Sequence, residues 1–263
     1  MTGLLLIVWR ELHSGKVFYV VLAVTTFYVW KLGLQTDVRY IDGVAQEVRM
    51  YGKVSSLIEL HDDYNAWPFI LLFLAIAAAG GVVPHLMRRG RIELLHSKPL
   101  TRTKLLLNTF LAVSVATSLI FIYFFGGVWI ATGLRTGVWY TVLLLGGFLW
   151  ILMCAVISAV VVLAGVIAGK SLLATTFSWF ACLIIPSILE VRDKLLYPLF
   201  ESDLARWGID RLYDTVPQIP KACRNIADLI VHGDFSALPL IQSIASGCAV
   251  LILAALIFRR KSF

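Results

Sequence analysis

Long apolar segments alternate with shorter polar ones along this chain. A helix of about 20 residues crosses a hydrocarbon layer of about 30 Å, so we predict that each long apolar segment is a membrane-spanning helix. Two longer polar segments, 36–65 and 190–238, interrupt the series. The six predicted spans are 17–34, 66–87, 105–134, 138–168, 172–189 and 240–258.

The first 14 residues are apolar but too short to span a membrane. Their apolar positions recur at helical spacing, with Trp9 among them, which is typical of a helix lying in the membrane interface. A cleaved signal peptide is the alternative, but Arg10 and Glu11 interrupt its apolar core. We predict an interfacial elbow helix over residues 1–14.

The two polar segments are predicted to lie outside the membrane on the same side. Segment 36–65 carries more acids than bases, and its weak helical stripe predicts a surface helix. Segment 190–238 is cut by prolines into short pieces, with amphipathic stretches at 195–200 and 222–230. We expect short helices there that rest on the outer leaflet or partly re-enter the membrane.

Glycines and prolines mark special positions within the spans. Pro68 is predicted to lie in the first turn of the second span, and Pro84 to kink that span near its end. Small residues allow helix backbones to approach closely. The residues predicted to pack helices together are Gly80, Gly81, Gly165 and Gly169. For Gly165 and Gly169, packing within one chain is favoured over a contact between two copies.

The composition agrees with one bundle of membrane helices. Hydrophobic residues make up 59% of the 263 residues and charged residues only 15%, and the mean hydropathy is +0.85. The net charge of +7 could indicate a nucleic-acid partner, but the basic residues gather at the ends of apolar segments. By the positive-inside rule, 88–104, 259–261 and both termini are predicted to be cytoplasmic, with no nucleic-acid partner.

The sequence offers little for catalysis or ion coupling. It has no Gly-rich nucleotide-binding loop, and its spans hold hardly an ionisable residue, which disfavours a proton-driven carrier. His61, Asp62 and Asp63 could form a metal or acid–base cluster, but exposed loop residues are the favoured interpretation. Hydroxyls in the spans could line a pathway, although most such groups bond to the preceding helical turn: Ser114, Thr117, Ser118, Ser158, Thr175, Thr176 and Ser178.

The segment 88–104 between the second and third spans is strongly basic, and Glu93 is its only acid. Pro99 ends one helical turn, and Thr101 is placed to cap the next helix. From composition alone the segment could be no more than a topological anchor. Its ordered pattern is more specific, since Gly90–Arg102 reads Gly-Arg-Ile-Glu-Leu-Leu-His-Ser-Lys-Pro-Leu-Thr-Arg.

This pattern resembles the signature of the type-2 ATP-binding-cassette (ABC) transporter permeases. In that family the loop carries a coupling helix that sits in a groove of a separate ATPase subunit, and Arg91 stands where the family usually has a small residue. The resemblance extends to the elbow, the six spans and the basic tail. It implies that the residues of the ATPase contact are Arg91, Ile92, Glu93, Leu94, Leu95, Ser97, Pro99 and Arg102.

The resemblance implies an all-α polytopic membrane protein, 1–263 forming one transmembrane domain, located in the bacterial cytoplasmic (inner) membrane. Such a subunit would be a permease, with export the expected direction. Its partners would be two ATPase chains, which bind ATP and Mg, and a second permease copy or close homologue. This chain would hold no cofactor or metal and would not be an enzyme. The alternative is a structural or assembly membrane protein; an intramembrane enzyme lacks a catalytic pair.

Overall fold

The computed structural model describes residues 16–41, 44–50, 53–54, 57–86, 101–137, 139–199 and 202–260. Within them the chain is mainly α-helical, as predicted. The first helices are α2 (Lys16–Gln35), α3 (Leu57–Ala79), α4 (Val82–Leu86), α6 (Arg102–Thr136) and α7 (Thr141–Ala168). Next come α8 (Ser171–Trp179), the π-helical segment η1 (Phe180–Ile184), α9 (Ile185–Glu190) and α10 (Arg192–Leu195). The last are the 3₁₀ turn η2 (Tyr197–Leu199), α11 (Asp203–Thr215), α12 (Ile219–His232) and α13 (Leu238–Arg260).

Five helical segments of the described chain are long and apolar enough to cross a membrane. They fall within or around five of the six predicted spans: Pro68–His85, Arg102–Arg135, Thr141–Ala168, Ser171–Glu190 and Leu238–Arg260. The remaining predicted span corresponds to α2, which is helical but has a shorter apolar stretch, Phe18–Lys31. The predicted elbow at 1–14 lies outside the described residues.

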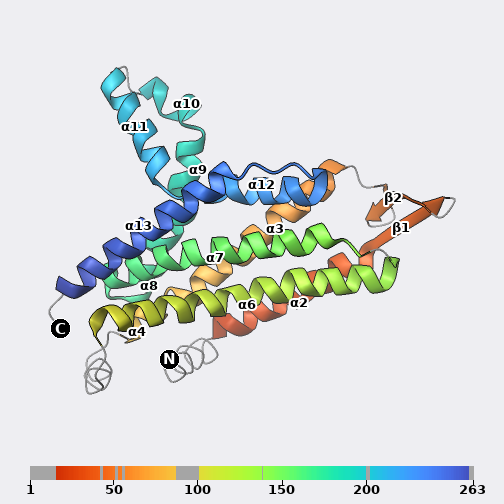
Figure 1. Ribbon diagram of the computed structural model, residues 1–263, viewed down its shortest axis with the longest axis horizontal. Coiled ribbons are helices and arrows are strands. Elements are labelled where there is room, and N and C mark those ends of the chain that lie inside the picture. The colour runs from red at the N-terminus through yellow and green to blue at the C-terminus, as the bar shows by residue number, and fades with distance from the viewer. Residues whose placement is uncertain are drawn as a thin grey trace.

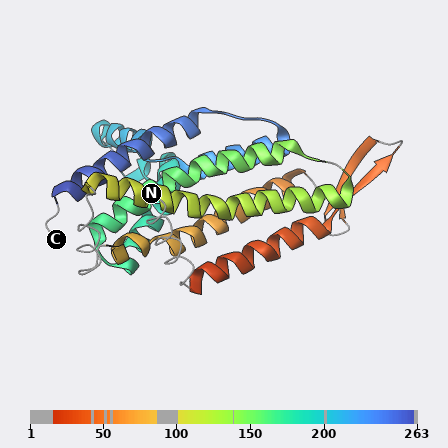
Figure 2. The ribbon, with the colours of Figure 1, turned by 60° about the horizontal axis from the view of Figure 1, so that its bottom comes forward.

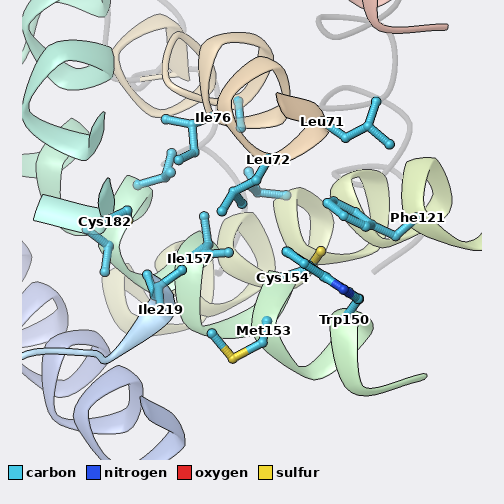
Figure 3. Close-up of a cluster of buried hydrophobic side chains, with 14 of the residues drawn as sticks. Leu71, Leu72, Ile76, Phe121, Trp150, Met153, Cys154, Ile157, Cys182 and Ile219 are labelled. Atoms are coloured by element: carbon cyan, nitrogen blue, oxygen red, sulfur yellow. The ribbon is translucent and has the colours of Figure 1, made fainter. Parts of the chain in front are cut away.

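The core of the bundle forms around α7, which packs against α6, α8, α12 and α13. Figures 1 and 2 show α6 and α7 side by side along the long axis of the molecule. Trp150 of α7 is completely buried and stacks on Phe121 of α6, with ring centroids 5.0 Å apart. The neighbouring Met153 and Cys154 belong to the same buried cluster (Figure 3). Since α7 has no charged residue, most of its length can be buried in the bundle without burying a charge.

The surface helix predicted within 36–65 is wrong, because this segment begins with a small antiparallel sheet. Its strands are β1 (Thr36–Ile41), β2 (Val44–Met50) and β3 (Lys53–Val54), in the order β1-β2-β3. Val38 lies opposite Val48, and Ile41 opposite Val44. β-Branched residues favour strands over helices. The hairpin extends beyond the end of α6 (Figure 1), so the fold is not wholly α-helical.

Two prolines occupy positions that differ from the prediction. α3 begins at Leu57, so Pro68 lies inside the helix and not in its first turn. The predicted kink at Pro84 is also misplaced, because the helix breaks earlier, at Gly80 and Gly81, and α4 then restarts. Pro84 therefore falls in the first turn of α4. Backbone N–H groups in a first turn have no acceptor within the helix, so proline, which lacks this group, costs no helical hydrogen bond there.

The fifth apolar segment is one continuous helix with a π-helical turn in its middle. The amide of Ile185 bonds to the carbonyl of Phe180, five residues earlier. Pro186 follows directly, and it has no amide with which to continue the α-helical pattern. The wider turn accommodates this missing donor without ending the helix.

The segment between the fifth apolar helix and α13 is helical, as predicted, but its two parts differ. α12 is not a surface helix: Ala222, Cys223 and Ile226 are buried, and it packs against α3 and α7. α10 and α11 instead project sideways from the bundle (Figure 1), and neither helix contains a buried residue. The apolar stripe of α12 is thus a packing face within the bundle.

Candidate functional site

The residues of the predicted coupling segment lie mostly outside the described part of the chain. These are Arg91, Ile92, Glu93, Leu94, Leu95, Ser97 and Pro99. Both flanks of the segment are described, since α4 precedes it and α6 follows it. The geometry of these two flanks therefore shows how the segment is attached to the bundle.

The second flank begins with a capped helix. Thr101 has extended backbone angles, and its hydroxyl accepts a hydrogen bond from the Lys104 amide at 3.4 Å, which confirms the predicted cap. Arg102 follows, and its Nη1 donates to the carbonyl of Arg259 at 3.5 Å. This contact joins the start of α6 to the last turn of α13, where carbonyls lack helical partners.

Basic residues gather at the end of the bundle where this contact lies. Figure 1 places α4, the start of α6 and the C-terminus at this end. The described residues of this end, which we call the basic end, include Arg102, Lys104, Lys170, Arg259 and Arg260. No Asp or Glu stands among residues 82–86, 101–104, 168–171 or 257–260. In a membrane protein, such a cluster of Lys and Arg is typical of the cytoplasmic side.

The first flank, α4, is packed tightly against α7 and α8. A methyl group on Gly165 of α7 would lie 2.6 Å from Cβ of Val83 and 3.3 Å from Cδ of Pro84. A methyl group on Gly81 would lie 2.8 Å from the Ser171 hydroxyl, and Gly80 approaches Thr175. The glycines thus allow α4 and the break before it to contact the neighbouring helices at backbone distance.

Gly169 has a different role from the packing role predicted for it. It ends α7 with φ of +64°, in the left-handed region, and its amide bonds to the Gly165 carbonyl. Within the described residues, a methyl group at Gly169 would meet no atom within 4 Å. The residue is required by the turn between α7 and α8, because L side chains rarely adopt this conformation.

The hydroxyls within the spans mostly bond to their own helices, which is the favoured alternative from the sequence. Thr117 donates to the Val113 carbonyl at 3.0 Å, and Ser178 donates to the Ala174 carbonyl at 2.7 Å. Thr175 and Thr176 bond to carbonyls four residues earlier in the same way. One contact crosses between helices, with the Thr117 and Ser158 hydroxyl oxygens 3.5 Å apart. These groups lie in a packed core.

A second polar cluster lies just after α9, and the sequence analysis missed it. Asp210 of α11 accepts hydrogen bonds from Arg192 Nε at 2.7 Å and from the Tyr197 hydroxyl at 2.6 Å. The Arg192 guanidinium also lies over the Tyr213 ring, 4.1 Å from its centroid. We call these three residues, Arg192, Tyr197 and Asp210, the Asp210 cluster. The many charged residues in 192–214 could have indicated a polar cluster here, but no pattern in the sequence shows which of them pair.

The hydrogen bonds of this cluster shift two pKa values in opposite directions. The Tyr197 hydroxyl, and then Arg192, lower the pKa of Asp210 below its ordinary value of 3.8. The hydrogen bond to Asp210 raises the pKa of Tyr197 above its ordinary value of 10.0. Nearby, Arg224 of α12 forms an ion pair with Glu190 at the end of α9. The Arg224–Glu190 pair thus connects α12 to the end of α9, and the Asp210 cluster connects α11 to the segment that directly follows α9.

Comparisons with known proteins assign no family. No protein-family model matches the sequence, and no curated protein matches it either. In the part of the chain that the structure describes, no group of three or more His, Cys, Asp or Glu residues could hold a metal ion. The features that indicate a function are therefore the membrane-length helices, the basic end and the sequence of the segment attached there.

Proposed function

We propose that this chain is the membrane permease subunit of an ABC transporter, with export as its direction. The observation that carries the proposal is the position of segment 88–104: its sequence resembles the permease signature, and its two described flanks meet the basic end of a bundle of membrane-length helices. An ATPase subunit on the cytoplasmic side would find the segment there.

The described contacts support a role for this segment in transmitting movement. Its first flank, α4, packs on α7 and α8 through Gly165 and Gly81. Its second flank is linked to α13 through Arg102. A displacement of the segment would therefore act on four helices together, namely α6, α7, α8 and α13. A partner that closes on ATP would bias such a two-state element by binding one arrangement more tightly.

In this proposal, α2 also spans the membrane, so that there are six spans in all, and both termini are cytoplasmic. The chain forms half of a transporter, whose second half is another permease copy or close homologue. Two ATPase subunits bind ATP and Mg and carry out hydrolysis. Ile92, Leu94 and Leu95 pack into a groove of the ATPase, while Glu93 and Arg102 orient the segment by charge-assisted hydrogen bonds.

The decisive experiment is purification of the full chain from its native membrane in mild detergent, followed by reconstitution in lipid discs. We expect a particle that contains two permease chains and two ATPase chains, with ATPase activity that depends on the permease. A particle with one copy and no ATPase, reproduced in discs, would contradict the proposal and favour a structural or assembly protein.

A further inference from the structure

Helix α11 is amphipathic, and it carries three large apolar side chains that the protein leaves exposed. Leu204, Trp207 and Leu212 are 80%, 61% and 51% exposed, and no residue of the helix is buried. A short helix with exposed apolar side chains is only marginally stable in water by itself. Another apolar phase is therefore expected to cover this side of α11.

The Asp210 cluster fixes the level at which α11 is held. The apolar helix Ser171–Glu190 ends two residues before Arg192, and Arg192 is bonded to Asp210 of α11. Charged groups at the end of a membrane span lie in the polar headgroup region, because their burial in hydrocarbon is costly. Helix α11 is thus attached at the boundary where the fifth apolar helix leaves the hydrocarbon layer.

The direction of α11 agrees with this level. Figure 1 shows α11 running across the direction of α7, on the side of the bundle where α9 ends. Helix α7 is a membrane-length helix. A helix that runs across the direction of a membrane-length helix is oriented parallel to the membrane plane.

The exposed apolar surface of α8, η1 and α9 leads directly to α11. Phe180 and Ile184 are 49% and 41% exposed on this membrane-length helix, where lipid would surround them. The exposed apolar positions continue through Leu195 and Leu199, which connect α9 to α11. Exposed apolar side chains therefore occur at each step of the chain from the fifth apolar helix to α11.

The charges on α11 indicate which kind of lipid surface suits it. Three acids, Asp203, Asp210 and Asp214, stand against Arg206 and Arg211, so the helix carries no excess of positive charge. Attraction to anionic lipids requires such an excess. Trp207 supplies the aromatic ring that is common at headgroup depth.

We propose that α11 is an interfacial membrane helix, which inserts Leu204, Trp207 and Leu212 at the boundary between headgroups and acyl chains of a zwitterionic bilayer. The Asp210 cluster holds its opposite side against the end of the fifth apolar helix. This assignment depends on the membrane-length helices alone, so it would hold even if the chain were not a transporter.

The test places a nitroxide spin label at single cysteines of the full chain in phosphatidylcholine vesicles. Only Cys248 needs replacement beforehand, because Cys154, Cys182 and Cys223 are buried. Leu204→Cys and Leu212→Cys report on the apolar side. Asp203→Cys is the comparison: it is exposed, and at about 100° per residue it lies opposite Leu212, about 100° from Leu204 and at the edge of the side that holds Trp207.

We expect oxygen, which concentrates in lipid, to relax the labels at 204 and 212 several-fold more than a water-soluble nickel complex does. The label at 203, at the edge of this side, should show a lower ratio of oxygen to nickel accessibility than either of them. Adding an anionic lipid should leave all three ratios unchanged. If the three labels are equally accessible to nickel, or if 204 and 212 are shielded from both reagents and show dipolar broadening between copies, the lipid assignment is overturned. The second result would assign the surface to another copy of the chain.

Discussion

Trp179 and Phe73 are joined in two ways. Their rings stack almost parallel, with centroids 4.2 Å apart and planes 4° apart. The Trp179 Nε1 also donates to the Phe73 carbonyl at 3.1 Å. The pair connects the end of α8 to the middle of α3, two helices that are distant in sequence.

Replacement of Trp179 should reveal both parts of this contact. Trp179→Phe keeps an aromatic ring but loses the donor, and a lost hydrogen bond costs about 0.5–1.5 kcal/mol. Trp179→Ala also loses the stacked ring pair, worth about 0.5–1.5 kcal/mol more. Thermal unfolding in detergent should therefore rank the proteins wild type, Trp179→Phe, Trp179→Ala. Phe180→Ala, at an exposed neighbouring position, is the control and should shift the midpoint least.

Gly165→Ala should destabilise the bundle. The new methyl group would approach Cβ of Val83 at 2.6 Å, and valine cannot move this atom without moving its backbone. Overpacking of this kind costs about 1–3 kcal/mol. The matched control is Gly126→Ala in α6, where the methyl group meets no described atom within 4 Å. Equal thermal midpoints for the two variants would contradict the close packing of α4 on α7.

The attachment of α11 should depend on pH at both extremes. Asp210 has a lowered pKa, so its contribution is complete above about pH 3.8, its ordinary value, and is lost as the pH falls through the lowered pKa. Tyr197 has a raised pKa, so its contribution is complete below about pH 10.0 and is lost as the pH rises through the raised pKa. The mobility of a spin label at position 212 should therefore increase in acid below 3.8 and in strong base.

Two variants identify the groups responsible for this pH profile. Asp210→Asn removes the carboxylate of the cluster, so the label should be mobile at neutral pH and insensitive to acid. Asp214→Asn removes an exposed acid from the same helix and should leave the profile unchanged. A profile that survives Asp210→Asn would show that another group controls the attachment.

The two ends of α7 should lie on opposite sides of the membrane. Tyr140 and Lys170 flank this helix and are both exposed. Because Lys170 belongs to the basic end, we expect Lys170→Cys to react with an impermeant thiol reagent only after permeabilisation of the cells. Tyr140→Cys, placed like it in a Cys248→Ser background, should react in intact cells. Reaction of Lys170→Cys from outside would reverse the proposed orientation.

The coupling segment should be sensitive to two substitutions that leave insertion intact. Glu93→Ala removes one member of a proposed charge pair at the ATPase contact, which typically costs about 2–5 kcal/mol when the partner is left buried. Leu94→Asp places a charge in the proposed apolar contact. Both should weaken ATPase copurification by tenfold or more, or uncouple hydrolysis from transport. Asp62→Ala, in a predicted outer segment, should bind the ATPase normally.

A result in which Glu93→Ala and Leu94→Asp both keep full ATPase binding and substrate-stimulated hydrolysis would reduce the segment to a topological anchor. The spin-label experiment on α11 is independent of this outcome, because it measures contact with lipid.

Hydropathy predicted the long helices well, because their burial in lipid or in the bundle depends on composition over many residues. The prediction of a surface helix within 36–65 failed because both a helical and a strand periodicity fit the same segment. Val38, Ile41, Ala45 and Val48 recur at helical spacing, but the same region contains two β-rich runs separated by Asp42-Gly43. That dipeptide is a strong hairpin signal, and it was the more informative feature.

The polar contacts could not be predicted, since they depend on the tertiary arrangement. The sequence shows Arg192 and Asp210 eighteen positions apart with no regular spacing between them. Likewise, Gly165 and Gly169 form one small-residue motif, yet the first packs against Val83 and the second ends a helix with positive φ. Only the positions of neighbouring helices separate these two roles.

The π-helical turn at Phe180–Ile184 also sets the rotation of everything that follows it. Ala174 and Pro186 are both buried although they are twelve positions apart, and twelve residues of α-helix would rotate them by about 120° relative to each other. One extra residue in the turn takes up about 100° of that rotation, so both remain on the same side. Deleting a single residue from 180–184 would restore uniform α-helix with Ala174 and Pro186 eleven positions apart, a net rotation of about 20°, so the Asp210 cluster and α11 would keep their side of the bundle. Closing the turn into α-helix without a deletion would instead swing them by about 100° around the helix axis.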